Sequence, residues 1–156
     1  ALDRLAEDLA DVTVVLQVHP NPQVQSEIAA SLAEESRVIL VPRLGHTEFI
    51  ARLSRAYLVI ADSGGVQEEA PSLGVPVLIT RDETERVEGV ESGASVLVGT
   101  NPSVIVSRAR SYLDGYLDPQ AQGLLPSPYG DGSASRRIVE GILWHFGLGE
   151  RPLEFK

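Results

Sequence analysis

The sequence contains neither cysteine nor methionine. Without cysteine there is no disulfide framework, no thiolate zinc site and no cysteine nucleophile, and nothing indicates an oxidising compartment, so we expect a cytoplasmic protein. An intact translation product starts with methionine, so a chain that begins at Ala1 and has no methionine is expected to be a fragment. No basic start followed by an apolar stretch indicates a signal peptide.

Basic charge and long apolar runs are also scarce. The formal net charge of -9 argues against a nucleic-acid partner, because such binders need a basic face to replace phosphate counterions. No apolar run approaches the roughly 20 residues that span a bilayer, so we expect no membrane segment. The remaining composition, 43% hydrophobic and 22% charged over 156 residues, predicts one domain, residues 1–156, with a single core.

Stretches with helical spacing of apolar residues alternate along the chain with short apolar runs. Short, fully apolar strands joined by helices are typical of a parallel sheet, which predicts an α/β, Rossmann-like fold. Ligands of such folds bind at the carboxyl ends of the strands. The expected helices cover residues 2–9, 24–32, 47–53, 66–73, 104–113 and 135–146, and the expected strands cover residues 12–18, 37–41, 56–61, 75–79 and 95–98.

The strongest local motif, DSGGVQEE at residues 62–69, lies between an expected strand and an expected helix. Gly64 and Gly65 let the backbone approach a ligand closely, and the amides at the start of the helix attract a phosphate. Ser63 adds a hydroxyl donor. The motif therefore predicts a phosphate site, although a tight turn capped by Ser63 with nothing bound would need the same residues.

Two acidic residues follow the glycines of this motif. Acids favour the first turn of a helix in any case, and Glu68 is interpreted as a solvated acid of this kind. A carboxylate one turn beyond a phosphate site can also accept both hydroxyls of a ribose. We assign that role to Glu69.

Two further side chains at expected strand ends are suited to phosphate chemistry. His19 could donate a proton to a phosphate or serve only to shape its loop. Arg86 has planar donors that match a diphosphate, but it could equally pair with Asp82, Glu83 or Glu85. A glycine-rich segment at residues 128–132 either turns the chain before the last helix or adds backbone amides to the same site.

The run from Asp62 to Val77 resembles, almost letter for letter, a pattern of the non-hydrolysing UDP-N-acetylglucosamine 2-epimerases. The shared segments continue in the same order at His19–Pro22, Thr84–Arg86, Leu97–Thr100 and Pro128–Gly132. The resemblance covers nearly the whole chain and is to the carboxyl-terminal domain. It implies the second of two Rossmann-like domains in a GT-B architecture, with the active site in the cleft between them.

The resemblance also implies roles for individual residues. His19 would be catalytic beside the phosphates, Glu69 would hold the ribose, and the loop at Pro42–Leu44 would face the uracil. The residues that it places on UDP are Arg43, Leu44, Ser63, Gly64, Gly65, Glu69 and Arg86.

The implied reaction inverts carbon 2 of UDP-N-acetylglucosamine, through elimination of UDP to a 2-acetamidoglucal and re-addition of UDP, without nicotinamide or metal. The acids and bases that act at carbon 2 would belong to the absent amino-terminal domain, so we expect the isolated chain to bind UDP without turnover. The parent protein would be a homodimer. A hydrolysing epimerase, a GT-B glycosyltransferase and a stand-alone nucleotide-sugar-binding module remain alternatives.

Overall fold

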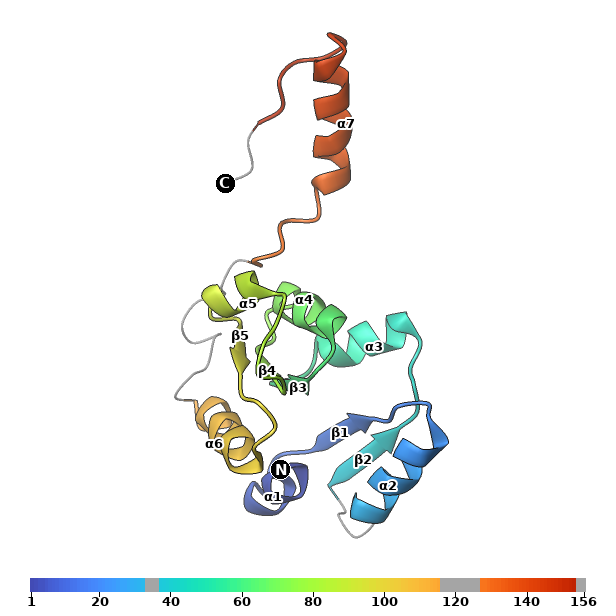
Figure 1. Cartoon of the computed structure of the whole chain (residues 1–156), viewed down its shortest axis with the longest axis vertical. Helices are drawn as coiled ribbons and strands as arrows, with labels where there is room; N and C mark the ends of the chain where they lie inside the picture. Colours follow the sequence, from blue (N-terminus) through green and yellow to red (C-terminus); the bar gives the residue numbers. More distant parts are fainter. Residues whose placement is uncertain (33–36, 116–126, 154–156) are drawn as a thin grey trace.

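The computed structural model of the protein describes residues 1–32, 37–115 and 127–153, and helices alternate with strands as far as Leu113 (Figure 1). The strands are β1 (Val14–Gln17), β2 (Val38–Val41), β3 (Val59–Ala61), β4 (Val77–Ile79) and β5 (Ser95–Leu97). The helices are α1 (Leu2–Asp8), α2 (Pro22–Leu32), α3 (His46–Leu53), α4 (Gly64–Ser72), α5 (Val87–Glu91), α6 (Pro102–Leu113) and α7 (Ala134–His145).

Every strand pairing is parallel, as the sequence predicts, but the described strands form two sheets instead of one. β1 pairs with β2 in the first, and the order β3-β4-β5 makes the second. Helix α1 joins them, because it packs against both α6 and β2. Arg37, just before β2, donates hydrogen bonds to the carbonyls of Ala6 and Leu9, and Asp8 pairs with Arg110 of α6.

Strand β4 lies at the centre of the core. Its side chains alternate between the two faces of the sheet, as the pleat requires. Leu78 packs with residues of α1 and α6, whereas Val77 and Ile79 pack with residues of α3 and α4 on the other face. All three side chains are fully buried. The three-stranded sheet is therefore covered on both sides, which explains why β3 and β4 are continuously apolar.

Helices α2 and α7 differ from this region because neither has a buried residue. Figure 1 shows α7 standing apart from the rest of the chain. Its exposed apolar side chains are Ile138, Val139, Ile142, Leu143 and Trp144. None of the helices in the described part of the chain is long and apolar enough to cross a membrane.

Most predicted elements are present with shifted ends. The strands are shorter than predicted because backbone pairing, and not the apolar run itself, sets their limits. Helix α4 begins at Gly64, two residues before the predicted start, and Gly74 follows it at a φ of 75°, which only glycine adopts readily. The sequence does not predict α5, because five residues are too few to show helical periodicity.

Candidate functional site

The amino-terminal end of α4 presents backbone amides to solvent. The first hydrogen bond of the helix joins the amide of Gln67 to the carbonyl of Ser63, 3.2 Å away, so the amides of Gly64, Gly65 and Val66 precede any partner within the helix. Ser63 occupies the N-cap position, but its hydroxyl makes no capping hydrogen bond. The Ser63 side chain therefore does not cap this helix, and the part of the alternative that assigns it a capping role is wrong.

Arg86 lies directly over this end of the helix. A side chain at position 64 would place its Cβ 3.2 Å from Oε1 of Glu85 and 3.9 Å from Nη2 of Arg86. Glycine at position 64 therefore lets the loop after β4 close over α4. The structure brings two predicted site residues, Gly64 and Arg86, together at one point.

The guanidinium of Arg86 is balanced by two carboxylates. Its Nε donates to Oε1 of Glu68, and Oε1 of Glu85 lies 3.7 Å from Nη1. The hydrogen bond with Glu68 raises the pKa of Arg86 above its ordinary value. Glu85 also pairs with Arg81, at 3.3 Å. A hydrogen bond from its own backbone amide, followed by the charges of these two arginines, lowers the pKa of Glu85.

Two interpretations of this cluster need revision. Glu68 is 43% exposed but is not only a solvated acid, because it also holds the side chain of Arg86. Of the acids weighed as partners of Arg86, only Glu85 contacts it in the described structure, and the stronger contact is to Glu68. A diphosphate at this point would replace the Glu85 carboxylate beside Gly64, because both carry negative charge.

Glu69 lies on the same helix, with its carboxylate toward α3. Its Oε1 is 3.1 Å from Nε2 of His46, the first residue of α3. The carboxylate remains partly accessible, with 34% of the Glu69 side chain exposed, while His46 is 75% exposed. Glu69 can thus accept hydrogen bonds from a ribose only from the side that His46 does not occupy.

The remaining predicted residues follow β1 and β2. His19 is exposed, and its Nδ1 accepts a hydrogen bond from the amide of Asn21 at 3.1 Å. A neutral ring with an accepting Nδ1 carries its proton on Nε2, which is therefore the donor. The amide of Leu44 donates to Oε1 of Gln17 at 3.5 Å, whereas Arg43 is exposed. No hydrogen bond or ion pair joins these residues to Ser63 or Arg86 within the described ranges.

The glycine-rich segment before α7 has a structural role. Asp131 accepts hydrogen bonds from the Ser133 amide and from both terminal nitrogens of the Arg137 guanidinium. Tyr129 is turned inward, and a Cβ at Gly89 of α5 would lie 2.5 Å from its hydroxyl. Burial, and then the charges of nearby acids including Glu68, raise the pKa of Tyr129. This segment turns the chain into α7, as one of the two interpretations predicts.

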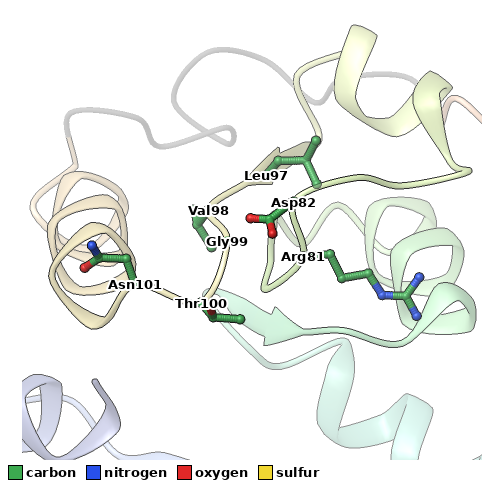
Figure 2. Close-up of a pocket in the computed structure, with 7 residues that line it drawn as sticks. All are labelled: Arg81, Asp82, Leu97, Val98, Gly99, Thr100 and Asn101. Atoms are coloured by element: carbon green, nitrogen blue, oxygen red, sulfur yellow. The ribbon is translucent and has the colours of Figure 1, made fainter.

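A hollow of about 360 Å³ lies at the carboxyl ends of β4 and β5 (Figure 2). In Figure 2 the Asp82 carboxylate turns toward Val98 and Gly99, while the Arg81 side chain extends away from them. The hollow is lined by Arg81, Asp82, Leu97, Val98, Gly99, Thr100 and Asn101. None of these residues belongs to the predicted UDP site, which is an exposed surface at α4 beside the hollow.

This arrangement suits the binding of an anion, and few side chains at the start of α4 are suited to proton transfer. A phosphate placed at the start of α4 would have helix amides, the Ser63 hydroxyl and the Arg86 guanidinium as donors. In residues 1–32, 37–115 and 127–153, no three His, Asp or Glu side chains gather closely enough to hold a metal ion. The geometry favours recognition of a diphosphate.

Comparison with known proteins supplies the family. The profile described as UDP-N-acetylglucosamine 2-epimerase matches residues 1–143. The chain belongs to the UDP-N-acetylglucosamine 2-epimerase family. It is 43% identical to UDP-N-acetylglucosamine 2-epimerase of Bacillus subtilis (strain 168), over 99% of this chain and 41% of that protein.

Solved structures of the epimerase family share the fold. The co-structure of S. aureus MnaA with UDP matches with a TM-score of 0.89 and 37% identity, over 99% of this chain and 43% of that one. UDP-GlcNAc 2-epimerase from Neisseria meningitidis bound to UDP-GlcNAc matches with a TM-score of 0.81 and 36% identity, over 92% of this chain and 39% of that one. The α/β class and the GT-B relationship are confirmed. The chain corresponds to the C-terminal part of these epimerases and spans about two fifths of their length.

Three residues around the candidate site are not marked by the sequence motifs. Gln67 and Glu68 hold the loop that carries Arg86, and His46 contacts Glu69. The spacing of Gln67 and Glu68 after the glycines is visible in the sequence, but their partners lie 17 and 18 residues away along the chain. No sequence signal marks His46, because its partner depends on how α3 packs beside α4.

Proposed function

We propose that this chain is the UDP-binding domain of a non-hydrolysing UDP-N-acetylglucosamine 2-epimerase. The observation that carries the proposal is the placement of the Arg86 guanidinium beside Gly64, at the end of α4 whose first amides precede any partner within the helix. A diphosphate needs such convergent donors, and a turn with only a structural role does not. The structures of related proteins with UDP and with UDP-GlcNAc bound support the choice of ligand.

Each part of UDP has a proposed partner. Ser63, Gly64 and Gly65 bind the diphosphate together with Arg86, and Glu69 accepts the ribose hydroxyls. The loop with Arg43 and Leu44 faces the uracil. His19 directs the Nε2 proton to the phosphates as UDP leaves.

The proposed reaction is elimination followed by re-addition. Carbon 2 of the sugar loses its proton, the bond from carbon 1 to the diphosphate oxygen breaks, and UDP leaves a 2-acetamidoglucal. UDP then adds back with a proton delivered to the other face of carbon 2, which gives UDP-N-acetylmannosamine. The domain accelerates this step by binding the charge that develops on the diphosphate more strongly in the transition state than in the substrate.

The parent protein, in this proposal, supplies the rest of the site. The acids and bases at carbon 2 lie in the part of the epimerase that this chain does not span. The exposed apolar face of α7 suits contact with that part, because uncovered apolar area of this kind marks an interaction surface. A homodimeric parent and a cytoplasmic location stay predictions.

Calorimetric titration with UDP tests the binding role. We expect the chain to bind UDP and the Ser63→Ala, Glu69→Ala double variant to lose that binding. Absence of UDP binding by the unchanged chain at millimolar concentration would contradict the proposal. Product analysis of the parent protein separates the reactions: UDP-N-acetylmannosamine supports the non-hydrolysing epimerase, whereas free N-acetylmannosamine with UDP indicates the hydrolysing one.

A further inference from the structure

Gln67 is a fully buried polar side chain on the helix that forms the UDP site. A buried amide lowers stability unless its hydrogen bonds are made. Oε1 of Gln67 accepts a hydrogen bond from the hydroxyl of Thr84, 2.5 Å away, while Nε2 is buried without a partner in the described structure. The side chain is therefore directed at Thr84, although Nε2 remains unsatisfied there.

Thr84 passes this contact on to Arg86. Its hydroxyl donates to Gln67 and accepts a hydrogen bond from the backbone amide of Arg86, at 3.1 Å. The next residue on α4, Glu68, accepts from the guanidinium of the same arginine. Two consecutive residues of α4 thus fix Arg86. Gln67 fixes the backbone of Arg86 through Thr84, and Glu68 fixes the guanidinium of Arg86.

We propose that Gln67 is a positioning residue for UDP, which acts through Thr84 to hold Arg86 over the first turn of α4. The inference rests on the proposed function, because it names what orients the arginine of that site. An arginine whose backbone is anchored needs less ordering when the diphosphate arrives, so affinity rises without a new contact to the ligand. Packing alone would not require a buried amide at position 67, since an apolar side chain of similar length would fill the same space.

The test removes the hydroxyl of Thr84 and keeps its shape. Thr84→Val is expected to weaken UDP binding by about three- to tenfold, the loss that corresponds to one hydrogen bond. Thr84→Ser, which retains the hydroxyl, is the matched control and is expected to bind UDP as the unchanged chain does. Gln67→Met is a second variant, which removes the oxygen of Gln67 that accepts the Thr84 hydrogen bond. Thermal unfolding reports whether each variant is folded.

A double-mutant cycle with Arg86→Ala separates positioning from packing. If Gln67 and Thr84 act through Arg86, then Thr84→Val causes no further loss of UDP affinity in the Arg86→Ala background. An equal loss in both backgrounds overturns the proposal, as does unchanged UDP binding by Thr84→Val and Gln67→Met. Failure of the unchanged chain to bind UDP would instead overturn the proposed function, and this inference with it.

Discussion

The region around β3-β4-β5 and the region around β1-β2 are built from the same kinds of residue but are covered differently. Val77 and Ile79 of β4 are 0% exposed, whereas Val15 of β1 is 46% exposed and Ile39 of β2 is 48% exposed. Helix α7 resembles the second region, with Ile142 53% exposed. The first region completes its core within this chain, while the second and α7 leave apolar side chains uncovered.

The residues of the proposed site are divided between the same two regions. The proposed phosphate-binding end of α4 and the loop with Arg86 belong to the completed region. His46 and Glu69 belong to it as well, because α3 packs on this region, whereas His19, Arg43 and Leu44 belong to the uncovered one. The proposed diphosphate contacts are therefore preorganised in this chain, whereas the proposed uracil contacts and His19 depend on how the second region is placed.

Truncating one isoleucine in each region should give the largest contrast. Ile79→Ala leaves a cavity in the core and should lower the free energy of unfolding by about 2–5 kcal/mol. Ile142→Ala, the same change on the exposed face of α7, should lower it by about 0.5 kcal/mol or less. Urea denaturation followed by circular dichroism measures both values. Similar losses in the two variants would show that α7 is buried in solution and would break the comparison.

Removing one arginine from each half of the site should give a smaller but separable difference. Arg86→Ala removes a charge-assisted contact to the diphosphate and should weaken UDP binding by about ten- to a hundredfold. Arg43→Ala removes an exposed charge at the proposed uracil loop and should weaken it by about fivefold at most. Calorimetry on both variants provides the measurement. A larger loss for Arg43→Ala would place the binding energy in the β1-β2 region instead.

The sequence predicts the completed region better than the uncovered one. The apolar run at β4 fixes that strand because all three of its residues are buried, and Gly64 and Gly65 at the start of α4 mark the proposed phosphate site. The separation of β1-β2 from the other strands leaves no trace in the sequence, because the apolar pattern of β1 and β2 is the same whether or not a neighbouring strand is present.

The partners of site residues are the part that the sequence does not provide. In the sequence, Glu68 has the position of an ordinary solvated acid in a helix. Only the closure of the loop after β4 over Gly64 gives it Arg86 as a partner. No feature of the sequence marks Gln67 either, since its burial depends on Thr84 packing against it. Local motifs thus suggest where to look for a ligand site, while the residues that orient its proposed contacts depend on packing between segments that are distant along the chain.

Lowering the pH should destabilise the start of α7 before the rest of that helix. The hydrogen bonds from Arg137 and then from the Ser133 amide hold the pKa of Asp131 well below its ordinary value. A depressed pKa stabilises the folded state fully above the unfolded pKa of about 3.9, and this contribution is lost as the pH falls below it.

The matched variant is Asp131→Asn, which cannot ionise. The unfolding midpoint of α7, followed through the fluorescence of Trp144, the single tryptophan of the sequence, is measured for both proteins from pH 6 to pH 3. The unchanged chain should be the more stable one at pH 6, and its advantage should shrink steadily once the pH falls below about 4. Other carboxylates titrate in both proteins and cancel in the difference. A difference that stays constant over this range would mean that Asp131 holds α7 by its shape and not by its charge.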